Sequence, residues 1–418
     1  MSVISLTGLP RVEHAAESRP VALQTSAGRI LLRFHENFID AEEAWRFLEA
    51  RGLCVNAQTF VRARLWFETV SATRGYRLAI AVGCSDSGQP LFVWPFQVEP
   101  VNGVSCLRWI GWEHANYQMG LYTLDFAQKV TPGDMRAIIQ QFAELAGASA
   151  ALLKYQPVEW DGAPNPFALL PRRSSSSNGY AILLDKDFDN LYRNKFSGKT
   201  RNTARRKEKK LLDAGDVEIS WAQSPEERLP LLEEFFRQKN RQLAEQGIPD
   251  AFADETVRAF YRQLAALSSG RDGTLEIASL RVNGENLAIA CGITFKDKFE
   301  TLLTSIGAGP LSRHSPGAML TKFQVADACR RGLNFFDMGV GEGPHKRDWC
   351  DVHVPLFDTA IAFDEKGYVA TLPYIAMTAG KRYIKNTPVL WAAARFVRNS
   401  FFGKQNKSST AATAPSAN

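Results

Sequence analysis

The 418-residue chain has little cysteine, and its six cysteines lie far apart. No two of them form a Cys-x-x-Cys pair, so the sequence offers neither the ligand spacing of a zinc site nor a disulfide framework. No apolar run reaches membrane-spanning length, and the N-terminal residues lack the basic start and apolar stretch of a secretion signal. These absences lead us to expect reduced thiols, no bound metal and a cytoplasmic location.

Acidic residues are missing after Glu365, in a stretch that holds eight lysines or arginines. A second basic strip, Arg193 to Lys210, holds nine cations and one glutamate. Each strip carries +8, and because the whole chain carries only +6, the remainder carries −10. Positive charge is therefore expected to act on partners locally, through these two strips.

The length exceeds that of one comfortable hydrophobic core, and the 45% apolar content is typical of a globular protein, so we expect two domains. Helical and strand patterns alternate, which indicates the mixed α/β class. The polar run Arg172 to Gly179 has no periodic pattern and is the expected linker. On each side of it, helical patterns precede three strands, a helix that starts with Thr-Pro-Gly or Ser-Pro-Gly, and a further strand. This order predicts one fold used twice.

The second of these helix starts carries the strongest functional signal. Ser315 is a preferred N-cap residue, Pro316 suits the first helical position, and Gly317 lets a ligand approach the second backbone N–H. Such a start favours a phosphate or pyrophosphate, although the same residues also begin helices that bind nothing. The helix is predicted to end before Gly332.

A short buried strand, Asn334 to Met338, is expected next, and it runs into Gly339 and Gly341. Glycine-rich strand ends beside a helix N-terminus are where open α/β sheets bind ligands. The loop His345 to Trp349 adds two cations and an indole, which could hold phosphate oxygens and cover a flat group such as adenine. A solvated basic loop is the alternative.

Three parts of the second half form a recognisable set: Phe196 to Arg201 with Arg205, Lys209 and Gly215; Leu311 to Gly317; and Phe336 to Gly339 with Gly341, Lys346 and Trp349. This set resembles the GNAT superfamily of acyltransferases, specifically the CelD-like proteins associated with cellulose and exopolysaccharide production, which are related to the Fem-type transferases. The family pattern usually has tyrosine where this chain has His345. The first half matches much more weakly, through Trp109 to Gly111 and Ala115 to Tyr117.

The resemblance implies two tandem GNAT-like domains, each a mixed, mostly antiparallel sheet flanked by helices, with acyl-CoA as co-substrate. We expect an N-terminal GNAT-like domain over 1–171, a linker over 172–179, a C-terminal acyltransferase domain over 180–370, a basic amphipathic helical tail over 371–405, and disorder over 406–418.

The activity implied is transfer of an acyl group, most simply acetyl, to an amine or hydroxyl of a sugar or amino-sugar acceptor, in exopolysaccharide or cellulose production. Asp337 and His345 are the candidate general bases, beside solvent. Histidine needs little tuning near neutral pH, whereas an aspartate needs a pKa raised by burial. Each also has a structural alternative, since Asp337 could anchor loop amides and His345 could be a surface residue.

The predicted donor site consists of main-chain amides near a helix start, cations and the indole: Arg313, Ser315, Gly317, Ala318, Gly339, Gly341, Lys346, Arg347 and Trp349. Lys199, Arg201 and Arg205 are predicted to hold an anionic acceptor, because Arg201 and Arg205 share one helix face with Lys209. A solvated helix face is the alternative.

Two rival functions remain. One is a Fem-type transferase that uses aminoacyl-tRNA, ranked lower because the basic strip lacks the interleaved aromatics that stack bases. The other is a non-catalytic module that holds a polysaccharide-synthesis component. In that case a helix from Thr387-Pro388, with Arg395 and Arg398 opposite an apolar cluster, could contact anionic lipid or pack on its own domain.

Overall fold

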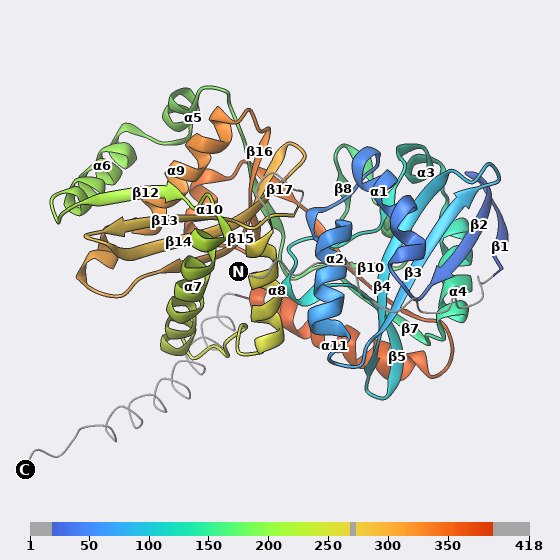
Figure 1. Ribbon diagram of the computed structural model, residues 1–418. Coiled ribbons are helices and arrows are strands. Elements are labelled where there is room, and N and C mark those ends of the chain that lie inside the picture. Colours follow the sequence, from blue (N-terminus) through green and yellow to red (C-terminus); the bar gives the residue numbers. More distant parts are fainter. Residues whose placement is uncertain (1–18, 268–272, 388–418) are drawn as a thin grey trace, which may run out of the picture.

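The computed structural model describes residues 19–267 and 273–387. Figure 1 shows two lobes side by side, each built on one sheet with helices beside it. Within the described residues, nine strands form the first sheet and seven form the second. Most neighbouring strands are antiparallel, but β5 pairs with β7, and β15 with β16, in parallel. The predicted fold class is therefore confirmed.

The first sheet has the order β1-β2-β3-β4-β5-β7-β18-β10, with β6 paired to β4. Its large aromatic side chains, among them Trp94, Phe96 and Trp109, are fully buried and form the core of this lobe with α4. The strands are β1 (Val21–Thr25), β2 (Gly28–His35), β3 (Arg77–Ser85), β4 (Pro90–Val101), β5 (Val104–Trp109), β6 (Leu121–Tyr122), β7 (Ala150–Pro157), β10 (Arg172–Ser174) and β18 (Leu356–Ala362); the helices are α1 (Glu42–Arg51), α2 (Phe60–Trp66), α3 (Leu124–Lys129), α4 (Pro132–Ala146) and α11 (Gly367–Asn386).

The second sheet has the order β12-β13-β14-β15-β16-β11-β17. Asn283 and Gly284 both have positive φ, as the predicted tight hairpin between β13 and β14 requires. The strands are β11 (Gly179–Leu183), β12 (Val217–Trp221), β13 (Glu276–Val282), β14 (Glu285–Phe295), β15 (Lys298–Ile306), β16 (Phe335–Val340) and β17 (Val352–Val354); the helices are α5 (Phe188–Lys195), α6 (Gly198–Leu212), α7 (Pro225–Glu245), α8 (Glu255–Ala266), α9 (Pro316–Arg330) and α10 (Pro344–Trp349).

The chain crosses between the lobes twice, which differs from the expected domain boundaries. Strand β18 follows the whole second sheet in sequence, yet it pairs with β7 and β10 of the first sheet. The expected linker 172–179 contains β10, and the expected boundary at 370 falls inside α11, which packs on β5, β7 and β18. Local periodicity identifies a strand but not the sheet that it joins, so this exchange left no trace in the sequence. Residues 388–405 of the expected tail lie outside the described residues.

The two lobes share one hydrophobic core. It joins side chains of α1 and α2 with side chains of α7, α8 and the second sheet. Trp66 and Phe260, one from each lobe, meet edge to face with ring centroids 5.0 Å apart. Because this apolar contact is continuous, the relative position of the lobes is fixed by packing.

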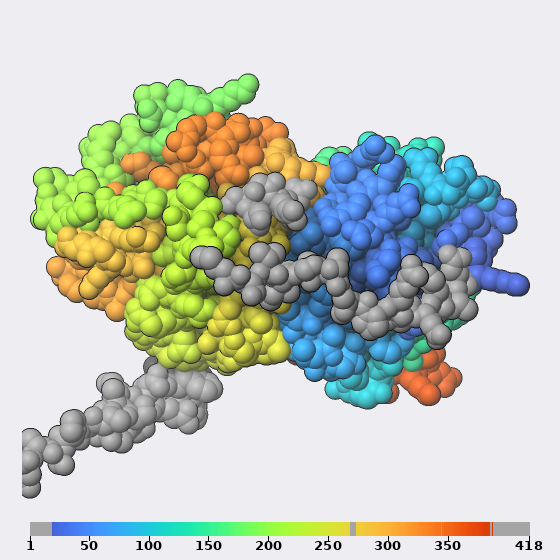
Figure 2. Space-filling model, in the orientation of Figure 1, coloured from blue at the N-terminus to red at the C-terminus, as the bar shows by residue number. Residues whose placement is uncertain are grey.

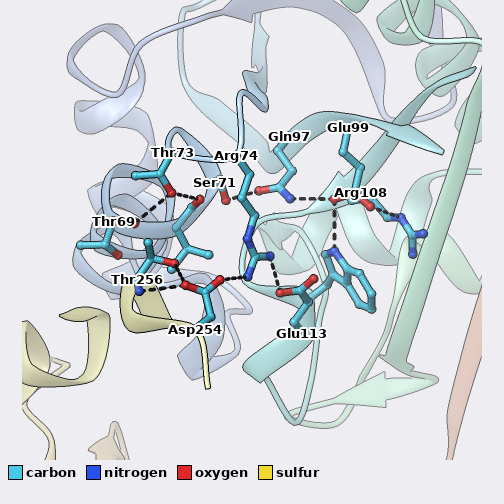
Figure 3. Close-up of polar contacts among 12 residues, drawn as sticks. Thr69, Ser71, Thr73, Arg74, Gln97, Glu99, Arg108, Glu113, Asp254 and Thr256 are labelled. Atoms are coloured by element: carbon cyan, nitrogen blue, oxygen red, sulfur yellow. Dashed lines mark hydrogen bonds and ion pairs between the residues drawn. The ribbon is translucent and has the colours of Figure 1, made fainter. Parts of the chain in front are cut away.

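A polar cluster beside this core also bridges the lobes (Figure 3). The Arg74 guanidinium donates to Glu113 at 2.6 Å in its own lobe and to Asp254 at 2.9 Å, at the start of α8. Hydrogen bonds from Thr256 and Arg74 lower the pKa of Asp254 to about 2. This carboxylate therefore stabilises the folded protein above its unfolded pKa of about 3.9, and the contribution is lost as the pH falls toward 2.

We expect Arg74→Ala to lower the free energy of unfolding at pH 7 by about 0.5–1 kcal/mol, since the pair is partly exposed to solvent. Urea denaturation at pH 7 and pH 3 should show a smaller difference at pH 3, because Asp254 is then closer to losing its charge. Arg29→Ala is the control, since Arg29 forms a more exposed pair with Asp86 within one lobe. An equal loss in both variants would contradict a special role for the bridging pair.

Candidate functional site

The site lies where two parallel strands of the second sheet separate. Strands β15 and β16 pair only from Lys298 to Glu300 and from Phe335 to Asp337, although β15 continues to Ile306 and β16 to Val340. Beyond the Glu300–Asp337 pair, the facing edges of the two strands are no longer hydrogen-bonded to each other. Unpaired strand edges can bind an extended ligand chain through their main-chain groups.

A cavity of about 560 Å³ occupies this separation and reaches the start of α9. Side chains alternate along a strand, so Phe336, Met338 and Val340 all point to the cavity side of β16. Of the predicted site residues, the cavity brings together Ser315, Gly317, Ala318, His345, Lys346 and Trp349. Other lining residues, which the sequence did not single out, include Lys239, Gln242, Thr301, Thr304, Thr321 and Gln324.

The start of α9 differs in detail from the predicted cap. Ser315 occupies the N-cap position, but its φ of 59° is left-handed and its side chain makes no capping hydrogen bond. Its hydroxyl instead accepts a hydrogen bond from Lys207 of α6 at 2.9 Å. The amides of Ala318 and Met319 donate to the Ser315 carbonyl, whereas the Gly317 N–H has no partner among the described residues. One free amide, one lysine and the helix dipole therefore meet at the cavity.

The equivalent helix start in the first lobe is closed. At α4, Thr131 accepts from the Asp134 amide at 3.3 Å, and the Asp134 carboxylate accepts from the Thr131 amide at 2.9 Å. The same carboxylate also accepts from the Ser26 amide at 3.2 Å. Because a carboxylate already occupies this helix start, a phosphate would meet like charge there. The two Pro-Gly starts are thus unequal, and only the one in α9 is open to an anion.

Two buried carboxylates mark the point where the strands part. The Asp337 Oδ1 accepts from the Tyr117 hydroxyl at 3.0 Å and from the Gly339 amide at 2.6 Å. Burial, together with the nearby Glu300 carboxylate, raises the pKa of Asp337 to about 7. Asp337 adjoins a smaller cavity on the other side of β16, which also touches Asn56 and Trp160 at the lobe interface.

Asn116 of the first lobe reaches into the separation between the strands. Its Nδ2 donates to the Glu300 carboxylate at 2.8 Å and to the Thr301 carbonyl at 3.1 Å, both on β15. Its Oδ1 accepts from the Val340 amide at 3.2 Å on β16. Gly339 has a φ of 76°, and a Cβ added there would lie 2.7 Å from the Asn116 Oδ1. The first lobe therefore completes the site, and Gly339 leaves room for it.

The loop after β16 has three distinct roles. Lys346 is buried, its Nζ donates to the carbonyls of Gly339 and Val340 at 3.0 and 3.1 Å, and burial lowers its pKa. His345 lines the cavity, and burial together with the Lys346 charge lowers its pKa. Trp349 is only 7% exposed and packs edge to face on Phe196, with ring centroids 4.7 Å apart. Its indole is a core residue at the cavity wall, which leaves it little face to cover a ligand.

The remaining predicted residues lie outside the cavity lining. Arg313 and Arg347 are solvent-accessible, and the Gly341 amide donates to the Asn178 carbonyl. On α6, Lys199 and Arg205 are exposed, whereas Arg201 donates to the carbonyls of Arg193 and Phe196 at the end of α5. Arg201 thus caps a neighbouring helix. Lys207, on a different face of α6, contacts the cavity wall through its hydrogen bond to the Ser315 hydroxyl.

Sequence reasoning missed Asn116, Tyr117, Glu300 and Lys207 as site residues. Asn116 and Tyr117 had one signal, the weak resemblance in the first half. Glu300 lies within a strand pattern, where a single carboxylate cannot be recognised as a site residue from the sequence alone. Its importance arises only from the parallel partner strand and from the lobe packed above it.

Comparison with known proteins places this site in a known domain type. Residues 198–347 match the family model described as acetyltransferase (GNAT) domain. This part of the chain has a GNAT fold. The match includes α6, β15, α9 and β16, and therefore most of the elements around the cavity. It supports acyltransferase chemistry for this lobe.

Solved structures similar to the chain cover both lobes. The crystal structure of FemX has a TM-score of 0.53 at 12% identity, over 78% of this chain and 96% of FemX. L-PGS from Bacillus licheniformis has a TM-score of 0.47 at 14% identity, over 83% of this chain and 97% of that one. A tandem GNAT protein from the clavulanic acid biosynthesis pathway has a TM-score of 0.43 at 12% identity, over 80% of this chain and 99% of that one. At these identities the likeness to FemX concerns the fold alone.

A search of curated proteins finds no significant match. None of the described helices has the length and apolar character needed to cross a membrane. Within residues 19–267 and 273–387, no three His, Cys, Asp or Glu side chains gather where they could hold a metal ion.

Proposed function

We propose that the second lobe binds an acyl-CoA, most simply acetyl-CoA, in the cavity between β15 and β16, and transfers the acyl group to an amine or hydroxyl of a sugar or amino-sugar acceptor. The observation that carries this proposal is the continuity of the cavity. It runs from the open start of α9, where a pyrophosphate can bind, to the separated strands beside His345, and Asp337 lies at the same point of β16 on the opposite side of the strand. EC class 2.3.1 follows from the same proposal.

The donor would be held at three places. The Gly317 amide, the Lys207 ammonium and the dipole of α9 would bind the pyrophosphate. The pantetheine arm would lie along the separated edges of β15 and β16. Lys346 would act indirectly, since its ammonium holds the Gly339 and Val340 carbonyls and so fixes the end of β16. Arg313 and Arg347 remain candidates for outer contacts with the nucleotide.

The chemistry needed from the protein is modest, because a thioester is already activated toward attack. The protein must place the acceptor beside it, remove the acceptor proton and stabilise the oxyanion that forms. Asp337 is our preferred base, because its pKa of about 7 lets it accept a proton near neutral pH. Both of its hydrogen bonds are accepted by Oδ1, which leaves Oδ2 to take that proton. His345, on the cavity side, is the second candidate.

The acceptor would approach from the lobe interface, where Asp337 adjoins the smaller cavity. That cavity has a volume of about 20 Å³, which is room for one water molecule that would pass the acceptor proton to Asp337. The Trp160 indole at its wall is covered by the Lys298 ammonium, 4.4 Å from the ring centre. Lys199 and Arg205 on α6 are candidates for contacts with a longer anionic acceptor. A role in exopolysaccharide or cellulose production would be consistent with such an acceptor.

A second candidate function, aminoacyl transfer from tRNA as in Fem-type transferases, is favoured by one observation. The exposed cations of α6, among them Lys199, Arg205 and Arg206, present positive charge that RNA phosphates could contact. RNA binding should weaken steeply with salt, whereas binding of coenzyme A in the cavity should depend on salt far less.

Calorimetric titration of the full chain with coenzyme A tests the proposal through Lys207→Ala. We expect this substitution to weaken coenzyme A binding roughly five- to ten-fold, because it removes one charge-assisted contact to phosphate. Lys209→Ala is the control, since Lys209 lies on the same helix but pairs with Asp213 on the surface. Salt-sensitive RNA binding without coenzyme A binding would favour tRNA, and binding of neither would favour a non-catalytic module.

A further inference from the structure

A second large cavity lies in the first lobe, between β10 and α11. It has a volume of about 630 Å³ and is walled by five cations, Lys154, Arg172, Arg173, Lys381 and Arg382. The one carboxylate that the described residues contribute to its wall, Asp358, already accepts hydrogen bonds from the Ser175 hydroxyl and the Tyr155 amide. We call this cavity the basic groove. Its excess of positive charge suits an anionic group with several oxygens.

A buried hydroxyl beside the basic groove lacks a partner. Tyr374 of α11 is 6% exposed, and its hydroxyl has no hydrogen-bond partner among the described residues. Tyr374 lines an adjoining cavity of about 280 Å³ that shares Arg172, Arg173 and Asp358 with the groove. A buried unpaired hydroxyl costs free energy, and an oxygen of a bound ligand would recover it.

The outer face of α11 is apolar and exposed. Ten large hydrophobic side chains are exposed among the described residues, and six of them lie on this helix: Tyr368, Val369, Leu372, Met377, Tyr383 and Ile384. At 3.6 residues per turn they spread over about half of the helix circumference, on the side away from the buried Ala370 and Tyr374. We call this face the apolar stripe. The opposite face, with Ala370 and Tyr374, packs on the first sheet, so α11 is anchored to the lobe.

The stripe and the basic groove meet. Tyr383 is 68% exposed and belongs to both, and Lys381 and Arg382 precede it on the same helix. Residues 367–387 contain no aspartate or glutamate. Figure 1 shows α11 along the outer, lower side of the first lobe. A helix that presents exposed apolar side chains next to cations has the pattern of helices that lie in a membrane interface.

We propose that α11 and the basic groove bind the surface of a bilayer that contains anionic phospholipid. The apolar stripe would enter the interface, and the groove would hold a lipid phosphate. A soluble phosphate would occupy the groove but would leave the stripe in water, so the two features together favour lipid. This surface lies on the first lobe and makes no use of the donor cavity, and it is therefore independent of the proposed function.

Vesicle co-sedimentation of the full chain tests this proposal. We compare phosphatidylcholine vesicles with vesicles that also contain phosphatidylglycerol, and expect at least about ten-fold stronger binding to the anionic ones. The stripe variant is Leu372→Ser with Tyr383→Ser, and the groove variant is Lys381→Gln with Arg382→Gln. The groove variant should lose roughly 25-fold in binding, since each of two cations near an anionic surface contributes roughly five-fold. The stripe variant should lose about ten-fold or more, because it removes two apolar side chains that would be buried in the interface.

Matched controls come from α6, on the other lobe. Leu212→Ser removes an apolar side chain that is 56% exposed, and Lys209→Gln with Lys210→Gln removes two exposed cations. These controls should bind like the unmodified chain, and all variants should retain coenzyme A binding if they are folded. If a double variant does not fold, Arg173→Gln alone should weaken vesicle binding roughly five-fold.

Three outcomes would overturn the proposal. The first is equal binding to neutral and anionic vesicles, or binding to neither. The second is vesicle binding that the stripe and groove variants leave unchanged, which would assign it to another part of the chain. The third is that the chain binds soluble glycerol phosphate but no vesicles, and that the groove variant loses the glycerol phosphate binding. That result would make the groove a site for a soluble anion.

Discussion

Asp337→Asn should lower the acyl-transfer rate by roughly 10²- to 10⁴-fold, the contribution typical of a positioned general base. An asparagine can still accept the hydrogen bonds from Tyr117 and Gly339, so the substitution removes the proton acceptor while it keeps the local geometry. The measurement is release of the coenzyme A thiol with a panel of hexosamines and hexoses. Binding of coenzyme A should stay unchanged, because Asp337 adjoins the other side of β16.

The pH dependence separates a base from a structural carboxylate. In the unmodified enzyme kcat/KM should rise with pH through an apparent pKa near 7, because only the ionised Asp337 can accept a proton. His345→Ala should preserve that rise if Asp337 is the base. A large loss in His345→Ala with a near-normal rate in Asp337→Asn would reverse the assignment, and unchanged rates in both would leave solvent as the proton acceptor.

The same carboxyl has a defined effect on stability. The pKa of Asp337 in the folded protein lies above the unfolded value of about 3.9. The stabilising contribution of its protonated form to the free energy of unfolding is therefore fully present below pH 3.9, and it is lost as the pH rises through 7. Asp337→Asn should therefore flatten that part of the stability profile. The reason is that a neutral amide no longer has to lose a proton in a buried site next to Glu300.

Gly339→Ala should lower the free energy of unfolding by about 2–5 kcal/mol. Its left-handed φ of 76° costs about 1–2 kcal/mol for a residue with a Cβ. The new methyl would also displace the Asn116 side chain, which then loses its contacts with Glu300 and Val340. A buried carboxylate that loses a donor adds about 1–3 kcal/mol. Urea denaturation measures the change, and activity should fall with it because the strand separation is disturbed.

Gly341→Ala is the matched control for this substitution. Gly341 also has a positive φ, of 97°, but a Cβ there would meet no atom within 4 Å. It should show only the backbone cost. The double variant Asn116→Ala, Gly339→Ala should be less destabilised than the sum of the single variants, because the two changes remove the same contacts. Equal losses in both alanine variants would show that the contact between the lobes at Gly339 contributes little.

The sequence predicted the parts of this fold that local patterns determine. The helix after Ser315 and the strand that runs into Gly339 appear as α9 and β16, since N-terminal prolines and glycine-bounded apolar runs act over a few residues. The cavity at the α9 start also appears where the anion site was expected. The cap itself differs, because the Ser315 hydroxyl contacts Lys207 from α6, a residue 108 positions away.

What the sequence could not supply depends on tertiary contacts. Asn116, Tyr117 and Glu300 acquire their roles only when the lobes pack together, and no short-range pattern reports that packing. Trp349 and Arg201 looked like ligand contacts because an indole and a guanidinium suit them, yet each is used within the fold, for packing and for helix capping. A side chain that could bind a ligand is also one that can satisfy the protein's own groups.

Strand β18 has a consequence for biosynthesis. The first lobe leaves the ribosome early, but its sheet stays incomplete until residues 356–362 have been made, because β18 separates β7 from β10. Until then the edge of β7 is an exposed template to which other chains could add a strand. A chain that is truncated before residue 356 should therefore have a damaged first lobe, although that lobe is built mainly from the N-terminal half of the sequence. The two halves, when expressed separately, should aggregate.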